Sequence, residues 1–412
     1  MPMTDDDLAV MQVTRNLEIG GAQETARTLA KYLPRLGCST VVCAFGDGPL
    51  RPEIEKLGVP VELLPDRQHS IVAFPLFVRE MIRRRRDLLN LAAKHRTDVI
   101  QTQGLGTLDF LIATLGIGRT IQVWWTIQNQ NFMLREEHLP RYKWLLGPKI
   151  AVHRWLYRAG ARIVRGIIAV SDETALSFRD AVRHVGNKIT VVPNAVDIEF
   201  YPSPSDRDAV RAQLGFGPAD HMMTMVGTFK HQKGHRHLIE ATAQVAPSFP
   251  QLHVVLVGGG ELTRAIKEQV KWAGLADRIH FLGSRRDVPE LLAASDSFVL
   301  PSLWEGLPVA LVEAMASELP IIATAVSGTS QVVIDRVTGL LVPPADTTAL
   351  ALAMTELLSD PARAALMAAA GRERVVASFS ALAQAEKLAA LFRSEASARG
   401  DGKWEPRMVV RS

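Results

Sequence analysis

Two glutamates eight positions apart, Glu305 and Glu313, are the residues best placed for chemistry in this sequence. They lie in the segment PSLWEGLPVALVEAMASELP, a loop that runs into a predicted helix starting near Pro308, where the missing N–H costs nothing. In a continuous helix, eight residues would separate the two carboxylates by roughly 12 Å. Paired glycosidase carboxylates are only roughly 5 to 9.5 Å apart, so we expect these two to hold different parts of one extended ligand.

The chain between the two glutamates is suited to an anion. The backbone amides of Gly306 and Leu307 stand at the predicted helix start, where N–H groups and the helix dipole favour the negative charge of a diphosphate. Glu313 falls among apolar helical positions, and a buried carboxylate needs a partner. The alternative is a structural Glu313 that a neighbouring loop satisfies.

Glycines follow several predicted strands at the end where parallel sheets bind their ligands. They are Gly20 and Gly21, Gly227, the run 258–260, and Gly283. Lys233, six residues after Gly227, can bring a cation to a phosphate. These features favour an anionic, nucleotide-like ligand. The alternatives are glycines that only make tight turns and a lysine that is only solvated.

Length and composition indicate a globular protein of two domains. The chain has 412 residues, of which 47% are hydrophobic and 22% charged. The acidic start MPMTDDDLAV does not resemble a secretory signal and no apolar run has the length of a membrane span, so we expect a cytoplasmic location. Cys38 and Cys43 lie at the start of and within one predicted strand, whose extended geometry would keep them apart as reduced core or near-core residues.

The net charge of +4 hides one strongly basic region. Residues 66–165 hold 17 Lys and Arg against 7 Asp and Glu, a net charge of +10. Within it, residues 79–96 include four consecutive arginines, and residues 141–165 interleave basic with aromatic side chains. Such helices suit peripheral contact with an anionic membrane, and a solvated helix face is the alternative. No recognised binding module accompanies the charge, so nucleic acid is not an expected partner.

Apolar runs rich in β-forming residues alternate with helical patterns, which predicts parallel sheets in two doubly wound α/β units. A boundary is predicted in the Pro- and Gly-containing stretch 198–220. The predicted strands begin near residues 9, 39, 61, 98, 120, 165 and 188, and then near 221, 252, 278, 295, 319 and 339.

Seven stretches carry a resemblance to one family: IGGAQ at 19, AVSD at 169, VVPNAVD at 191, VGTFKHQKGH at 226, LVGGGE at 256, RIHFLG at 278 and SLWEGLPVALVEAMASELPIIAT at 302. Together they resemble the retaining glycosyltransferases of family 4, over roughly residues 10 to 395 and more strongly in the C-terminal half. The resemblance implies a GT-B fold, with two Rossmann-like domains facing across a cleft. The expected domains are 1–200 for the acceptor and 201–377 for the donor, with a helix at 378–396 packing back on the first domain and a tail at 397–412.

By that resemblance the C-terminal domain binds a nucleotide-sugar donor. Glu313 would hydrogen-bond the ribose, Lys233 would neutralise the diphosphate, and Glu305 with the backbone of Gly306 and Leu307 would hold the transferred sugar. The implied donor site also includes Gly20, Gly21, Gly227, Lys230 and Gly259, and the implied catalytic residues are Glu305, Lys233 and Gln128. No cofactor and no metal ion are implied, because Lys233 and the helix dipole would stabilise the leaving diphosphate.

Several positions depart from the family pattern. Thr228 stands where many members carry an arginine, and Lys230 is the nearest cation to replace it. Gln128 stands where many carry a histidine, and Gln101 and Gln103 stand where an acceptor-side histidine is often found. Glutamine can donate to a sugar hydroxyl but cannot titrate, so proton shuttling by Gln128 is excluded. A buried Gln128 satisfied by backbone is the alternative.

The predicted function is retaining transfer of a sugar from a nucleoside-diphosphate sugar to a hydroxyl of a glycan or lipid-linked acceptor. Assembly of exopolysaccharide, lipopolysaccharide or another cell-envelope glycan at the inner face of a membrane would suit it. The alternatives are a catalytically inactive GT-B scaffold in a glycan-assembly complex, and a GT-B epimerase or phosphorylase. The spaced glutamates argue against the epimerase. A nicotinamide dehydrogenase is excluded because IGGAQ is not the GxGxxG fingerprint.

Overall fold

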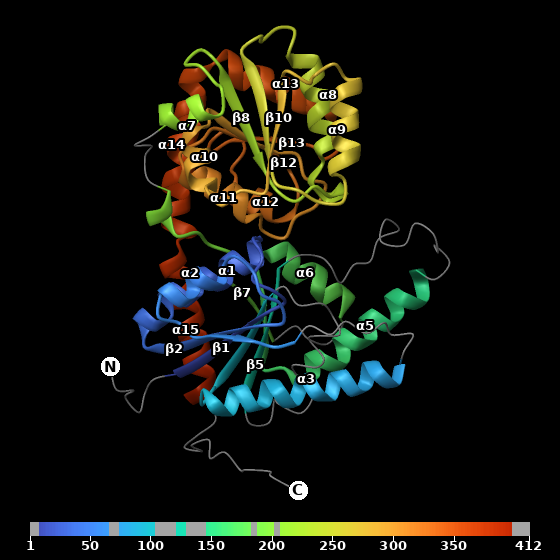
Figure 1. Cartoon of the computed structure of the whole chain (residues 1–412), viewed down its shortest axis with the longest axis vertical. Coiled ribbons are helices and arrows are strands. Elements are labelled where there is room, and N and C mark those ends of the chain that lie inside the picture. Colours follow the sequence, from blue (N-terminus) through green and yellow to red (C-terminus); the bar gives the residue numbers. More distant parts are fainter. Residues whose placement is uncertain are drawn as a thin grey trace, which may run out of the picture. The chain divides into compact units, whose positions relative to one another are not determined.

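The computed structural model describes residues 8–65, 74–103, 121–128, 146–182, 188–201 and 207–397. The chain divides into two compact units. The N-terminal unit combines Met1–Pro193 with Leu382–Ser412, and the C-terminal unit is Asn194–Ala381. Each unit is built on one parallel sheet with helices on both faces (Figure 1). Within the predicted tail, residues 398–412 lie outside the described part of the chain.

The N-terminal sheet has seven parallel strands in the order β3-β2-β1-β4-β5-β6-β7. The strand order reverses between β1 and β4, the switch point of a doubly wound sheet. All seven strands predicted from the sequence are confirmed. They are β1 (Leu8–Thr14), β2 (Cys38–Ala44), β3 (Val61–Leu63), β4 (Val99–Gln103), β5 (Gln122–Ile127), β6 (Gly166–Ala169) and β7 (Ile189–Val191).

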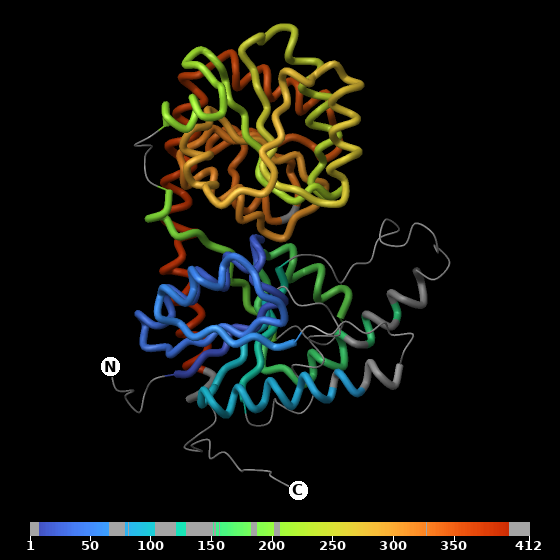
Figure 2. The backbone as a smooth tube through the Cα atoms, in the orientation of Figure 1, coloured from blue at the N-terminus to red at the C-terminus, as the bar shows by residue number. Residues whose placement is uncertain are grey.

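Helices cover both faces of this sheet. On one face lie α3 (Phe74–Lys94), α5 (Leu146–Ile163) and α6 (Asp172–Ala181), which share an apolar core with the strands. On the other lie α1 (Gly21–Tyr32) and α2 (Arg51–Lys56). The last helix, α15 (Ala381–Ser397), also packs on this unit, with the Phe392 ring centroid 5.7 Å from that of Trp124 on β5. In Figure 2 this red helix lies beside the blue segment that leads into β2, where Arg393 donates to the Leu36 carbonyl oxygen.

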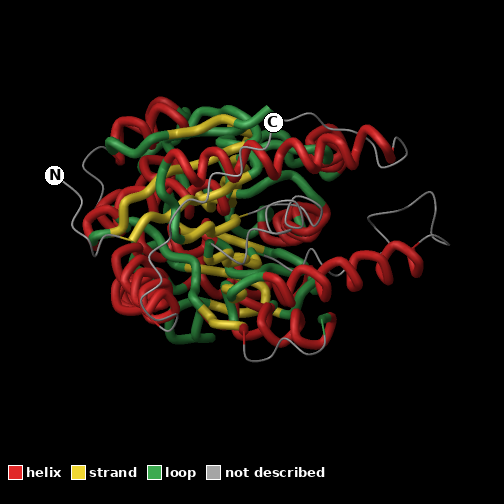
Figure 3. Tube along the Cα trace, turned by 90° about the horizontal axis from the view of Figure 1, so that it is seen from below, coloured by secondary structure: helices red, strands yellow, loops and turns green. Residues whose placement is uncertain are grey.

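The C-terminal sheet has six parallel strands in the order β10-β9-β8-β11-β12-β13. All six predicted strands are confirmed, and helices flank them on both sides (Figure 1). In Figure 3 the strands of the chain, in yellow, have helices, in red, on either side. The strands are β8 (His221–Val226), β9 (Leu252–Val257), β10 (Ile279–Gly283), β11 (Ser297–Leu300), β12 (Ile321–Thr324) and β13 (Leu340–Val342). The helices are α7 (Arg207–Gln213), α8 (His235–Val245), α9 (Thr263–Trp272), α10 (Val288–Ala294), α11 (Val309–Ala316), α12 (Ser327–Val332), α13 (Thr347–Ser359) and α14 (Pro361–Ser378).

The two cysteines are free and buried on β2, as predicted. Burial, with a smaller contribution from the nearby Glu62 carboxylate, raises the pKa of the Cys43 thiol to about 12. This thiol therefore stays protonated and unreactive at neutral pH.

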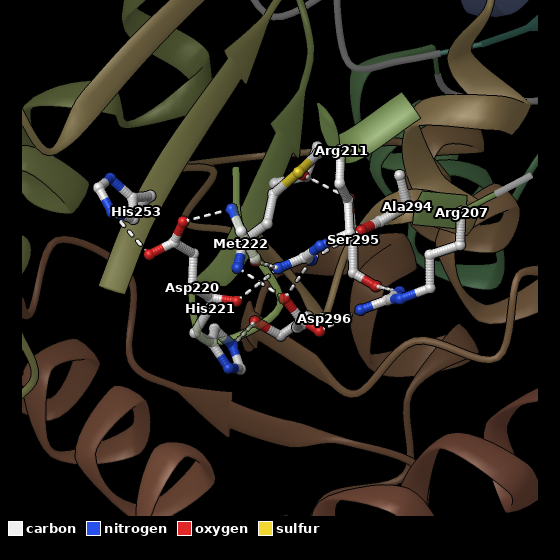
Figure 4. Close-up of polar contacts among 12 residues, drawn as sticks. Arg207, Arg211, Asp220, His221, Met222, His253, Ala294, Ser295 and Asp296 are labelled. Carbon is white, nitrogen blue, oxygen red and sulfur yellow. Dashed lines mark hydrogen bonds and ion pairs between the residues drawn. The ribbon is translucent and has the colours of Figure 1, made fainter. Parts of the chain in front are cut away.

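A polar cluster fastens α7 to the amino-terminal edge of the C-terminal sheet (Figure 4). Asp296 accepts hydrogen bonds from the Met222 backbone N–H at 2.7 Å and from Arg211 at 2.8 Å, and it also pairs with Arg207. Arg211 donates to three backbone carbonyl oxygens as well. Burial alone would raise the pKa of Asp296, but these donors hold it below its ordinary value. The cluster lies opposite the carboxyl ends of the strands, so its role is structural.

We expect Asp296→Asn to destabilise the C-terminal unit by about 3 kcal/mol, because it leaves two guanidinium groups facing a neutral amide in a partly buried site. Urea unfolding followed by circular dichroism measures the loss. Asp287→Asn is the matched control, because the Arg285–Asp287 pair is 38% and 39% exposed and exposed pairs contribute less than about 1 kcal/mol. Equal losses in the two variants would contradict the structural role of the cluster.

Candidate functional site

The predicted site residues of the C-terminal unit gather at the carboxyl edge of its sheet. Gly227 follows β8, residues 258–260 follow β9, and Glu305 lies in the loop after β11. Strands β9, β8 and β11 are neighbours and run parallel, so these loops leave the sheet at the same edge. Doubly wound sheets bind their ligands at this edge.

Lys233 and Glu305 form an ion pair among these loops. Lysine Nζ lies 2.5 Å from Glu305 Oε1, and the two side chains are only 16% and 6% exposed. The Ser302 hydroxyl donates to the same oxygen at 2.6 Å, and Gln232 Nε2 donates to the other oxygen at 3.4 Å. The Glu305 carboxylate is thus enclosed by three donors, and it fixes the position of the Lys233 ammonium.

Backbone geometry delivers Lys233 to this position. The short turn His231–Lys233 ends at Gly234. The backbone φ of Gly234 is +68°, in the left-handed region, which glycine adopts with little strain. A Cβ at Gly234 would also meet the Pro301 carbonyl oxygen at 2.0 Å, so only glycine lets this loop approach the end of β11 so closely. The stem of Lys233 lies against Gly227, 3.5 Å from where a Cβ would stand.

The turn at Gly306 and Leu307 is held on two sides. It leads into α11, whose N-cap is Pro308, close to the helix start predicted from the sequence. Asn194 Nδ2 donates to the Leu307 carbonyl oxygen at 3.2 Å. Behind the turn lies Gly328, where a Cβ would stand 1.7 Å from the Gly306 carbonyl oxygen. We did not identify Asn194 or Gly328 as site residues from the sequence, although Asn194 belongs to the VVPNAVD stretch.

Glu313 lies half-buried inside α11, and its Oε1 accepts a hydrogen bond from the Tyr201 hydroxyl at 2.7 Å. Tyr201 is buried and lies 112 residues away in sequence, so no local pattern indicated this contact. Arg372 of α14 donates to the Tyr201 carbonyl oxygen at 3.0 Å and holds the segment in place. This tyrosine is therefore one partner of the Glu313 carboxylate.

The remaining predicted donor residues of this unit lie nearby and near the surface. Lys230 and Thr228 are exposed next to Gly227, and Gly259 is half-buried in the loop after β9. Within the described ranges, no group of three or more His, Cys, Asp and Glu side chains is placed to share a metal ion.

Three predicted residues belong to the N-terminal unit. Gly20 and Gly21 follow β1 and begin α1, and Gln128 directly follows β5. Gln128 is half-buried and donates from Nε2 to Gln103 Oε1 at 2.8 Å. One hydrogen-bond partner of Gln128 is thus the side chain of Gln103. Gln103 and Gln101 are buried on β4.

Comparison with known proteins agrees with this arrangement. Residues 206–374 match the family of glycosyl transferases group 1, and residues 19–200 match Glycosyltransferase Family 4. The chain is 32% identical over 240 residues to a lipopolysaccharide core biosynthesis mannosyltransferase, LpsB, of Rhizobium meliloti, covering 57% of this chain and 66% of that protein. It is 31% identical over 245 residues to the UDP-Gal:alpha-D-GlcNAc-diphosphoundecaprenol alpha-1,3-galactosyltransferase of Escherichia coli, covering 58% and 63%. The matched regions thus span about two-thirds of these relatives or less.

The fold is also that of solved structures. Anabaena Alr3699/HepE in complex with UDP-glucose superposes with a TM-score of 0.77 at 23% identity, over 94% of this chain and 100% of that one. The shared architecture is the GT-B fold, with two Rossmann-like units on parallel sheets of seven and six strands. Because the two family matches together account for most of the sequence and the fold agrees with them, this chain belongs to the glycosyltransferases of group 1 and family 4.

Proposed function

We propose that this chain transfers a sugar from a nucleoside-diphosphate sugar to a hydroxyl of a glycan or lipid-linked acceptor, with retention of configuration. The observation that carries the proposal is the Lys233–Glu305 pair among the glycine turns of the C-terminal sheet. A departing diphosphate gains negative charge, and an ammonium already fixed in place stabilises that charge without reorganisation. The names of the relatives support a role in cell-envelope glycan assembly, and one relative is named for a diphosphoundecaprenol acceptor.

The site residues have different tasks in this proposal. Lys233 neutralises the diphosphate, with Lys230 nearby, and the N–H groups at the start of α11 add partial positive charge. Glu305 fixes Lys233 and, with Gly306 and Leu307, holds the transferred sugar. Glu313 accepts hydrogen bonds from the ribose hydroxyls. Neither a metal ion nor a cofactor takes part.

A catalytically inactive scaffold is the second candidate. Gln128 favours it, because an amide cannot transfer a proton where many relatives carry a histidine. The two candidates differ in a measurable way, since the scaffold would bind a nucleotide sugar without turning over any acceptor.

We expect one nucleotide series among UDP, GDP, ADP and their sugars to raise the melting temperature of the protein without added metal, because a ligand that binds the folded state stabilises it. Glu313→Ala should lower the affinity for that nucleotide at least tenfold. A hydrogen bond to a charged group contributes about 1.5–3 kcal/mol, which corresponds to a loss of this size. Tyr201→Phe is the matched control, because it removes the same intramolecular hydrogen bond but keeps the carboxylate. Unchanged affinity in Glu313→Ala would show that the donor site is wrongly assigned.

We also propose peripheral contact with an anionic membrane at its cytoplasmic face, through basic residues of α3 and α5. On α5, Arg154, Arg158 and Arg162 recur at intervals of four and are exposed, so they share one side of the helix. Next to them, Trp155 is 65% exposed. None of the described helices has the length and apolar character needed to cross a bilayer. Residues 141–145 of the predicted basic segment lie outside the described residues.

The structure restricts the arginines of α3 that can contact a membrane. Arg84 is 7% exposed, pairs with Glu80 and lies 5.1 Å from the ring centre of Phe45, so it belongs to the interior. Arg86, by contrast, is 72% exposed. A helix turns through 3.6 residues, and four consecutive arginines therefore cannot all face solvent when one side of the helix is buried.

We expect Trp155→Ala combined with Arg158→Glu to reduce binding to vesicles of phosphatidylcholine with one-third phosphatidylglycerol at least fivefold, because each basic residue contributes about 1 kcal/mol near an anionic surface. Vesicle co-sedimentation at low and high salt measures the binding. Trp272→Ala is the control, since Trp272 is 89% exposed but lies on α9 of the C-terminal unit. Equal binding by the wild type and the double variant would rule out α5 as the contact.

A further inference from the structure

Four glutamine side chains of the N-terminal unit form a continuous chain of hydrogen bonds. Gln128 donates to Gln103 at 2.8 Å, Gln103 donates to Gln12 at 2.9 Å, and Gln12 donates to Gln101 at 2.8 Å, each from Nε2 to Oε1. Gln101 in turn donates to the Thr126 hydroxyl at 2.9 Å. We call these four glutamines and Thr126 the amide chain.

Strand register explains why the five side chains meet. Gln12 of β1 pairs with Gln101 of β4, and Gln103 of β4 pairs with Thr126 of β5. Side chains alternate between the two faces along a strand, so residues two apart point to the same side. The amide chain therefore lies on one face of the sheet, and it ends at Gln128, directly after β5.

Burial separates Gln128 from the other three glutamines. Gln12, Gln101 and Gln103 are at most 1% exposed, whereas Gln128 is half-buried at the carboxyl edge of the sheet. Among the five members, only Gln128 thus reaches the edge at which parallel sheets bind ligands.

Stability alone does not account for the amide chain. Hydrogen-bonded buried amides can be replaced together by apolar groups of the same shape at little cost, whereas losing one partner costs about 1–3 kcal/mol. The opposite face of the same strands is filled with apolar side chains such as Met11, Ile100 and Trp125. A polar chain with four buried members that reaches the surface at a single amide points instead to a requirement at that amide.

We propose that Gln12, Gln101 and Gln103 are positioning residues that fix the Gln128 carboxamide as a neutral hydrogen-bonding group for a sugar hydroxyl of the acceptor. The inference rests on the proposed function. Each amide directs its N–H toward the next carbonyl, so the orientation of Gln128 is set by three side chains that are themselves buried. A fixed donor and acceptor recognise one stereochemistry of the hydroxyl, and they do so independently of pH because glutamine does not titrate.

The test removes the link next to Gln128. Gln103→Leu keeps a similar volume but breaks the chain, and Gln122→Leu is the matched control. Gln122 is 5% exposed on β5 and bonds to Trp124 Nε1 at 3.2 Å and to the backbone of Phe392, outside the amide chain.

The assay follows release of nucleoside diphosphate from UDP-glucose, UDP-galactose and GDP-mannose, with octyl glucoside, galactoside, mannoside and N-acetylglucosaminide as acceptors. We expect Gln103→Leu to raise the acceptor KM at least tenfold and to reduce discrimination between epimeric acceptors, with donor affinity within twofold of the wild type. Gln122→Leu should lower the melting temperature to a similar extent but leave the acceptor KM unchanged. An unchanged KM in Gln103→Leu, or an equal rise in Gln122→Leu, would overturn the inference.

A second measurement decides the positioning role even if no octyl glycoside is a substrate. In the full-length chain labelled with ¹⁵N-glutamine, the side-chain amide signal of Gln128 is identified by its loss in Gln128→Glu. Its protons should exchange with solvent at least tenfold more slowly in the wild type than in Gln103→Leu. Equal exchange rates would show that the amide chain does not hold Gln128, whether or not the protein transfers a sugar.

Discussion

The ion pair between Lys233 and Glu305 is the interaction on which the candidate site depends. A lysine ammonium is a point charge on a flexible stem, and ordering such a side chain costs up to about 2 kcal/mol of rotamer entropy. Here the Glu305 carboxylate is buried and held by Ser302, so the ammonium is ordered before any ligand arrives. Gly234 serves the same end, because it allows the close approach of the loop to the end of β11.

The strands, and the grouping of the residues that follow them, could be predicted from the sequence for a physical reason. Parallel strands buried on both faces appear as short apolar runs, and residues that follow them necessarily meet at one edge of the sheet. The contact of Tyr201 with Glu313 and that of Arg211 with Asp296 could not be predicted, because they join residues 112 and 85 positions apart. Neither local periodicity nor composition specifies which distant side chains will meet. A run of four arginines likewise does not reveal which member, here Arg84, lies on the buried side of the helix.

The two faces of the N-terminal sheet differ in kind. One face carries an apolar core under α3, α5 and α6, where packing alone is required. The other face carries the amide chain, in which every hydrogen bond depends on the next and a single missing partner is costly. Strands β1, β4 and β5 thus have apolar packing on one side and a hydrogen-bonded polar layer on the other.

The path of the chain makes the C-terminal unit an insertion into the N-terminal one. The first and last segments of the C-terminal unit lie side by side. Val196 forms an isolated β-bridge with Ser380, and its carbonyl oxygen accepts a hydrogen bond from the Ala381 N–H at 2.9 Å. The N-terminal unit, in contrast, is complete only when α15 covers Trp124. During synthesis on the ribosome, the strands of the N-terminal unit emerge first, but this unit can complete its fold only after the C-terminal unit has been made. Trp124 becomes covered only when α15, more than 250 residues further along the chain, has been synthesised.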